Sequence, residues 1–205
     1  MRPWSRGERT TAPSSPCDYG RCVTDTWTLD ASDGEMLVRT GVAGRAARMG
    51  HRLTIAMTRW QARVDWAGAD TSEPASAELA VETDSFEVLR GEGGVKGLSG
   101  AEKALVRSNA LRSLNAGRFP GIHFTSDTIE KTTEGYRLTG KLQIRGKSAE
   151  HVIDLHTEDL GDSWRMSAQS GVRQTDYGVK PYSLLMGSVR VADQVTVSFT
   201  AVRRK

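Results

Sequence analysis

Hydrophobic and polar side chains alternate with a period of two along several short stretches of this chain. The stretches are 36–41, 77–82, 122–125, 136–145, 151–156 and 195–201. Such alternation is typical of β-strands that bury one face and expose the other. Because glycine, asparagine or aspartate interrupts these runs, the pattern predicts an all-β protein built as an antiparallel meander.

The segment 51–66 is unusual because its apolar face changes phase. Leu53, Ile55 and Met57 occupy odd positions, whereas Trp60, Ala62, Val64 and Trp66 occupy even ones. A bulge or a sharp bend would produce this change within one long barrel strand. Two strands joined by a kink between Met57 and Trp60 would produce it equally well.

Two stretches carry a helical pattern instead. Residues 42–49 predict a short helix, and residues 99–115 predict a longer one with apolar residues near helical spacing. Ser99 and Glu102 have the spacing of a capping box, and Gly117 would end this helix. Lying after four expected strands and before four more, the longer helix would close one end of a barrel.

Composition narrows the class of protein. The chain has 205 residues, of which 38% are hydrophobic, and this suits one all-β domain. No stretch reaches the roughly 18 apolar residues that are typical of a transmembrane helix. The net charge is +3, and acids and bases alternate along the strands instead of forming the one-sign patch of a nucleic-acid-binding protein.

The two ends of the chain differ from its middle. Residues 1–26 are rich in Arg, Ser, Thr and Pro, a composition that predicts a disordered extension. They contain no apolar segment of the kind found in secretory signals, so a cytoplasmic location is expected. At the other end, residues 203–205 form a short basic tail.

Metal-binding chemistry is not indicated. Cys17 and Cys22 are the only two cysteines, and the nearest histidine is His51. A zinc site would need two more ligands close by. We therefore expect two idle thiols and no metal, with a disulfide across a short loop as the alternative.

Catalytic chemistry is equally sparse. His123, His151 and His156 show no catalytic or ligand spacing, so each is interpreted as an ordinary surface or core histidine. The glycine-rich segment 91–100 lacks the context of a phosphate loop and is interpreted as a loop over a barrel mouth. No nucleophile motif is present, so neither an enzyme nor a cofactor is predicted.

The segment 119–155 carries a specific order of residues. It reads FPGIHFTSDTIEKTTEGYRLTGKLQIRGKSAEHVIDL and resembles the central signature of the YceI-like family of lipocalin-like, lipid-binding proteins. The matching positions are Phe119, Pro120, Phe124, Ser126, Gly140, Leu142, Ile144 and Gly146. Similar positions before and after this segment extend the resemblance over about residues 27–202. Residues 47–53 depart from the family, whose first block has a Ser-His dyad.

The resemblance implies an extended eight-stranded antiparallel, lipocalin-like β-barrel over residues 27–202 that binds a polyisoprenoid or fatty-acyl lipid in an apolar tunnel. A barrel of eight strands has room for packed side chains or for one ligand. The residues expected to line the tunnel are Ile55, Trp60, Leu79, Phe86, Leu111, Phe124, Leu138, Leu142, Ile153, Val197 and Phe199. His51, Arg52 and Arg173 are candidate contacts for a ligand head group.

Three functions are compatible with the sequence. The first is a protein that carries or sequesters a lipid, and the second is a stress-related scaffold whose barrel is filled. The third is an enzyme acting on an apolar substrate, for which His51 is the only candidate group. The volume of the barrel interior separates the first from the second. Edge strands of an incompletely closed barrel could also pair across a homodimer.

Overall fold

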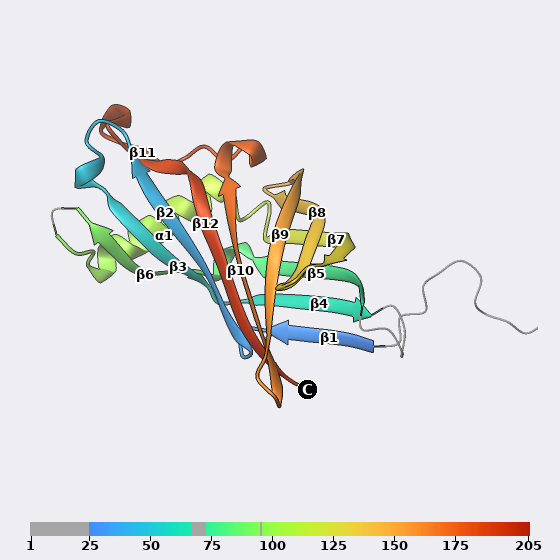
Figure 1. Cartoon of the computed structure of the whole chain (residues 1–205). Coiled ribbons are helices and arrows are strands. Elements are labelled where there is room, and N and C mark those ends of the chain that lie inside the picture. The colour runs from blue at the N-terminus through green and yellow to red at the C-terminus, as the bar shows by residue number, and fades with distance from the viewer. Residues whose placement is uncertain (1–24, 67–72, 95) are drawn as a thin grey trace, which may run out of the picture.

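The computed structural model describes residues 25–66, 73–94 and 96–205. The described strands form one antiparallel sheet that curls around a hydrophobic interior (Figure 1). They are β1 (Asp25–Asp30), β2 (Gly34–Ala43), β3 (His51–Met57), β4 (Trp60–Trp66), β5 (Pro74–Glu82), β6 (Phe86–Gly93), β7 (Gly121–Lys131), β8 (Gly135–Ile144), β9 (Lys147–Asp159), β10 (Ser163–Arg173), β11 (Ser183–Leu184) and β12 (Val189–Arg204). One α-helix, α1 (Gly100–Leu114), and four 3₁₀ turns, η1 (Ala47–Met49), η2 (Thr83–Ser85), η3 (Gln174–Tyr177) and η4 (Leu185–Gly187), complete the described elements.

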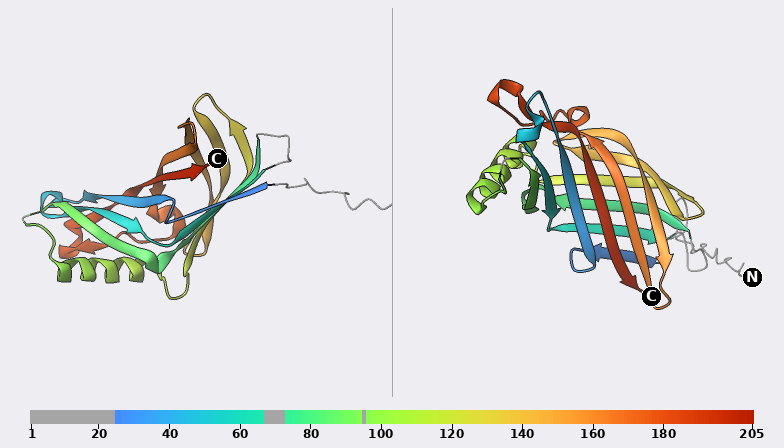
Figure 2. Two further views of the ribbon diagram at one scale, coloured as in Figure 1. Left: turned by 90° about the horizontal axis from the view of Figure 1, so that it is seen from below. Right: turned by 60° about the vertical axis from the view of Figure 1, so that its left-hand side comes forward.

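Long strands that continue through a corner bend the sheet back on itself. The strand order is β1-β4-β5-β7-β8-β9-β10-β12-β2-β3-β6, with β11 paired to β12. β3 leads into β4 and β5 into β6, and these two lengths of chain pair on both sides of the corner, β3 with β6 and β4 with β5. β1 likewise leads into β2. The two strands at the ends of this order, β1 and β6, are therefore continuous in the chain with the interior strands β2 and β5. This continuity curls the sheet into a barrel (Figure 2).

The predicted alternating stretches are confirmed as strands, whereas the predicted number of strands is wrong. The stretches lie in β2, β5, β7, β8, β9 and β12, and neighbouring strands pair antiparallel throughout the described sheet. The described residues form 12 strands instead of eight, because bends divide long lengths of chain and β11 adds a short strand. The phase change in segment 51–66 comes from a kink at Thr58 and Arg59 that separates β3 from β4.

The two helix predictions have different outcomes. The short helix over 42–49 is wrong, because Val42 and Ala43 pair with β12 and only Ala47–Met49 form a 3₁₀ turn. The longer helix is confirmed as α1, with a complete capping box between Ser99 and Glu102. Its end differs from the expectation, since Asn115 and not Gly117 takes the left-handed conformation, with φ 53°. Six described strands precede α1 and six follow it, instead of four and four.

The corner between the two long strands is held by backbone pairing across it. The Thr58 N–H donates to the Ser85 carbonyl at 3.2 Å, and the Glu82 N–H donates to the Arg59 carbonyl at 3.0 Å. The Ser85 hydroxyl donates to the Glu82 carbonyl at 2.7 Å. The bend therefore satisfies backbone groups that the interrupted strand ladder would leave unpaired.

Thr83 ties this corner to the segment that leads from α1 into β7. Its side chain is 1% exposed, and its hydroxyl donates to the Phe119 carbonyl at 3.1 Å. Its backbone N–H donates to the Pro120 carbonyl at 2.8 Å. A buried threonine with both polar groups paired positions two separate parts of the chain.

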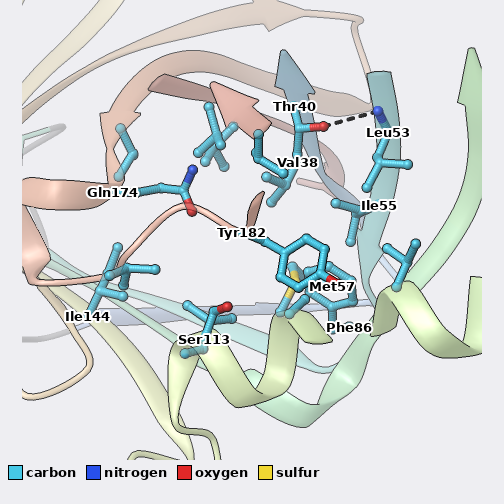
Figure 3. Close-up of a pocket in the computed structure, with 18 of the residues that line it drawn as sticks. Val38, Thr40, Leu53, Ile55, Met57, Phe86, Ser113, Ile144, Gln174 and Tyr182 are labelled. Carbon is cyan, nitrogen blue, oxygen red and sulfur yellow. Dashed lines mark hydrogen bonds between the residues drawn. The ribbon is translucent and has the colours of Figure 1, made fainter. Parts of the chain in front are cut away.

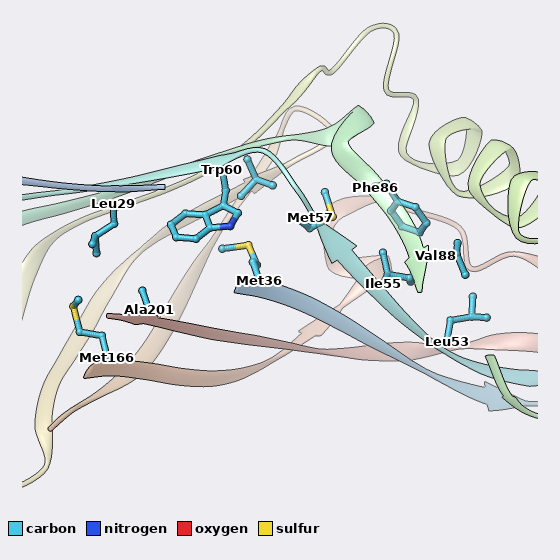
Figure 4. Packing of buried hydrophobic residues seen from close by; sticks show 11 residues of the cluster. Leu29, Met36, Leu53, Ile55, Met57, Trp60, Phe86, Val88, Met166 and Ala201 are labelled. Carbon is cyan, nitrogen blue, oxygen red and sulfur yellow. The ribbon is translucent and has the colours of Figure 1, made fainter. Parts of the chain in front are cut away.

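One end of the barrel interior is filled with side chains. Leu29, Trp60, Met166 and Ala201 are buried there in one cluster (Figure 4). The Trp60 and Phe199 rings meet edge to face with centroids 5.3 Å apart. Large side chains buried in this way each contribute roughly 1.5–3 kcal/mol, so this end acts as the packed core of the barrel.

The chain ends lie partly outside the described residues. The expected disordered extension over 1–26, with Cys17 and Cys22, falls outside them except for Asp25 and Thr26, which begin β1. Of the expected basic tail over 203–205, Arg203 and Arg204 belong to β12. β12 runs to Arg204, and the Arg203 guanidinium lies 4.9 Å from the centre of the Trp27 ring.

Two glycines of the segment 119–155 have clear structural roles. Ile144 pairs with Lys147 across the two-residue turn Arg145-Gly146, and both turn residues have positive φ, 52° and 74°, as in a tight β-hairpin. At Gly140 a Cβ atom would lie 2.2 Å from the Thr125 carbonyl oxygen. These positions therefore require glycine for backbone geometry and not for ligand contact.

We predict that Thr83→Val destabilises the fold by about 1–3 kcal/mol, because the Phe119 carbonyl loses its partner in a buried site. Urea unfolding measures the change. Thr125→Val, at an exposed position of β7, is the matched control and should stay within about 0.5 kcal/mol of the parent. Equal effects of the two substitutions would show that the Thr83 hydroxyl does not hold the corner.

Candidate functional site

The other end of the barrel interior encloses a cavity. Its volume is about 560 Å³, and its lining is largely aliphatic and aromatic. Strands β2, β3 and β5 to β12 contribute side chains to it, together with α1. Figure 3 shows Val38 and Ile55 on the wall formed by β2 and β3, with Ser113 of α1 and Tyr182 also bordering the space. The barrel is therefore filled at one end and hollow at the other.

Helix α1 forms one wall of the cavity. Glu102, Leu105, Val106, Asn109, Ala110, Ser113 and Leu114 line it, and their spacing of three and four places them on one helix face. No residue of α1 is fully buried, because this face borders open volume instead of packed side chains. Of the apolar positions expected on this helix, Leu105, Ala110 and Leu114 line the cavity, whereas Ala104 and Leu111 do not.

Two long basic side chains attach α1 to the sheet. Arg107 donates to the Phe86 carbonyl at 2.8 Å and to the Asp84 carbonyl at 2.5 Å. Lys103 donates to the Leu89 carbonyl at 2.6 Å. The helix is thus held to β6 and η2 by polar contacts along its side, and its inner face is left free to border the cavity.

Several polar side chains of the cavity lining hydrogen-bond to the protein's own backbone. The Thr40 hydroxyl accepts from the Leu53 N–H at 3.1 Å, which Figure 3 marks. The Gln174 side-chain amide donates to the Ala192 carbonyl at 2.8 Å. At the mouth, Nε2 of His51 lies 2.7 Å from the Lys96 carbonyl oxygen. These groups complete the wall and offer little to a ligand.

His151 and Ser170 form a polar pair inside this apolar cavity. His151 Nε2 lies 2.8 Å from the Ser170 hydroxyl oxygen, and both residues line the space. The imidazole also meets the Phe124 ring edge to face, with centroids 6.5 Å apart. Burial lowers the pKa of His151, which favours the neutral ring at neutral pH.

A neutral His151–Ser170 pair always has one hydrogen-bond donor to spare. A neutral imidazole carries one N–H, and a serine carries one O–H. Their mutual hydrogen bond uses one of these two donors, whichever tautomer is present. The other donor, either the His151 Nδ1–H or the Ser170 O–H, remains for a third group.

The structure brings many of the sequence-predicted site residues together around the cavity. Those that line it are His51, Ile55, Leu79, Phe86, Phe124, Leu142, Ile153 and Val197. Trp60, Leu111, Leu138 and Phe199 are outside the lining and pack in the adjoining hydrophobic clusters instead. Trp60, Leu138 and Phe199 point inward by the same alternation but lie where the interior is filled, whereas Leu111 belongs to α1 and packs beside its cavity-facing residues.

The two predicted arginine contacts do not reach the cavity. Arg52 and Arg173 are exposed, and each neighbours a lining residue, His51 or Val172. Successive side chains of a strand point to opposite faces, so both guanidinium groups lie outside the barrel. Arg173 Nε lies 3.7 Å from a carboxylate oxygen of Asp193.

The absence of any catalytic or ligand spacing around His151 does not reveal this polar pair. The available signal is the parity that His151 shares with Ile153 and Leu155 on the predicted strand 151–156. His156 has the opposite parity and is exposed, as is His123. Ser170 lies in β10, which the alternation did not identify, so its approach to His151 could not be predicted.

The described part of the chain offers no obvious metal site or membrane-spanning helix. Among its residues, no three His, Cys, Asp or Glu side chains gather so that they could hold a metal ion. None of its helices is long and apolar enough to cross a membrane.

Comparison with known proteins identifies a family and a shared fold. The family model of the YceI-like domain matches residues 27–202. BcnA of Burkholderia cenocepacia has a similar structure, with a TM-score of 0.62 and 18% identity over 85% of this chain and 99% of BcnA. The YCEI protein of Campylobacter jejuni has a TM-score of 0.53 and 16% identity over 74% of this chain and 84% of its own. No curated protein sequence matches.

We predict that His151 makes stability depend on pH. Because burial lowers its pKa in the folded protein, the unfolded chain binds the proton first, from about pH 6.5 downward. Stability should therefore fall as the pH drops from about 6.5 through the lowered folded pKa. His151→Asn should remove this part of the dependence in urea unfolding at a series of pH values. A profile unaltered by His151→Asn would contradict the assignment.

Proposed function

The chain belongs to the YceI-like family, which is known for a polyisoprenoid-binding fold, and on that premise we propose that it binds a long apolar lipid and carries or sequesters it. The ligand class is an isoprenoid or fatty-acyl chain, and its place is the cavity between α1 and the sheet. The observation that carries the proposal is the apolar cavity of about 560 Å³ at one end of the barrel. Ligand pockets typically enclose about 300–1,000 Å³ and are mostly apolar.

The physical reason for a lipid is the balance of apolar and polar surface in the lining. Each methylene group that leaves water for this cavity contributes about 0.8 kcal/mol. A flexible hydrocarbon chain can follow a space bordered by many strands and a helix. A scaffold protein with a filled barrel, the alternative considered from the sequence, would not need an open volume beside a packed core.

The polar pair favours a lipid that carries an oxygen atom. The spare donor of His151 and Ser170 is costly to leave without a partner in apolar surroundings, and a carbonyl, ether or hydroxyl oxygen of the ligand would pair with it. We propose this pair, and not Arg52 or Arg173, as the polar contact for the ligand. Binding without turnover is proposed, since a single neutral pair in an apolar cavity suits orientation of a ligand.

A direct test is mass spectrometry of an organic-solvent extract of the purified protein, beside its native mass. We expect a stoichiometric lipid with repeating isoprene or methylene units, or uptake of added prenyl or fatty-acyl lipid by an empty protein. An empty extract from a protein that also takes up no added lipid would overturn the proposal. Turnover of the bound lipid would favour an enzyme instead.

Adjacent residues of β9 provide a matched pair of variants for the same question. Ile153 lines the cavity, whereas Val152 faces outward and is 44% exposed. We predict that Ile153→Trp lowers the affinity for a fluorescent fatty acid at least about tenfold, because the larger side chain occupies ligand volume. Val152→Trp should bind as the parent does. Equal binding by both variants would place the ligand elsewhere.

A further inference from the structure

Exposed apolar side chains surround the mouth of the cavity. Met49, Leu105, Tyr182 and Leu184 line the cavity and yet are 50%, 61%, 37% and 52% exposed. Met186 projects fully into solvent from η4, next to β11. We call these solvent-exposed side chains at the cavity mouth the apolar rim. Exposed apolar patches of this kind mark surfaces that contact a protein or a membrane.

The rim is assembled from segments that are far apart in the sequence but tied together in space. The Ala46 N–H, just before η1, donates to the Ser188 carbonyl, just after η4, at 2.9 Å. Leu184 of β11 pairs with Val189 of β12. Figures 1 and 2 show η1 and the β11–η4 turn side by side at the end of the barrel where α1 lies, away from the C-terminus. The rim is therefore one surface and not a set of scattered positions.

The two loops that carry most of the rim are basic and contain no acidic residue. The stretch between Glu35 and Asp65 contains arginines but no Asp or Glu. The stretch between Asp176 and Asp193 contains Lys180 and Arg190 and likewise no Asp or Glu. This contrasts with the mixed charges of the rest of the chain.

The cations of these loops are available for an external partner. Arg45, Arg48, Lys180 and Arg190 make no ion pair or side-chain hydrogen bond with any described residue. Glu102, the acidic residue of the cavity lining on α1, is engaged by Ser99 and Lys96. The surface around the mouth thus offers apolar side chains together with unpaired positive charge.

We propose that this rim docks the cavity mouth on an anionic lipid bilayer, so that an apolar ligand passes between the bilayer and the barrel without crossing water. Basic side chains are attracted to anionic head groups, and apolar side chains beside them enter the interface. The passage of ligand rests on the proposed function, whereas the docking does not. The other candidate occupant is a second copy of this chain, which the test below distinguishes.

The test uses the full chain and three substitutions outside the cavity lining. Arg45→Gln and Arg48→Gln remove charge, and Met186→Asn removes the projecting side chain while asparagine tolerates the left-handed backbone at φ 53°. The control combines Arg204→Gln with Val202→Ser near the C-terminus, at the other end of the barrel. Co-sedimentation with vesicles of phosphatidylglycerol and phosphatidylcholine, or of phosphatidylcholine alone, measures docking.

We expect the parent and the control to bind the anionic vesicles and to bind phosphatidylcholine alone far less, with added salt weakening the interaction. The triple variant should lose about tenfold or more of the vesicle affinity, with an unchanged thermal midpoint. It should still take up a fatty acid supplied from cyclodextrin, while transfer from anionic vesicles slows by a similar factor. Equal vesicle binding by parent and triple variant would overturn the proposal. So would a dimer of the parent that the triple variant dissociates, since a second copy would then cover the rim.

The outcomes separate docking from ligand binding. Vesicle binding that depends on the rim, in a protein that takes up no lipid from cyclodextrin, would sustain the docking and overturn the proposed function. Uptake from cyclodextrin in a protein that ignores anionic vesicles would sustain the function and overturn the docking.

Discussion

The corner at Thr58–Arg59 and Thr83–Ser85 is the constraint on which the barrel depends. Two long lengths of chain stay paired on both sides of it, β3 with β6 and β4 with β5. A flat continuation of either strand would leave β1 and β6 as two distant edges of the sheet. The bend instead returns the sheet toward itself, and Thr83 links the corner to the chain that enters β7. The same corner also holds α1, because Arg107 donates to the Asp84 carbonyl within it.

The hollow end of the barrel follows from what forms its wall. At the filled end, side chains from facing strands meet, as Trp60 and Phe199 do. At the other end one wall is helix α1, held along its side by Arg107 and Lys103. Its inner face borders the cavity, and none of its residues is fully buried. A cavity therefore lies next to a packed core.

The polar pair and the apolar rim both lie toward the hollow end of the barrel. The polar pair of His151 and Ser170 lies inside the cavity, where the proposed oxygen-bearing lipid would be oriented. The apolar and basic rim lies at the mouth, where a bilayer would supply or receive that lipid. Ligand binding and membrane docking, both proposed, therefore rest on different groups of the protein. Only the transfer of ligand between bilayer and cavity requires both.

The sequence by itself determined the class of fold, several strands, the inward parity of their side chains and the start of α1, because these depend on neighbouring residues through periods of two and of 3.6 and through a local cap. The family resemblance, which rested on the order of residues in segment 119–155, is confirmed. Tertiary structure alone decided which inward residues fill the core and which border the cavity. Leu138 and Leu142 share one strand and one parity, yet only Leu142 lines the cavity. It also decided the pairing of His151 with Ser170 and the assembly of the rim, because both depend on strand register and on loops that meet only after the sheet has bent.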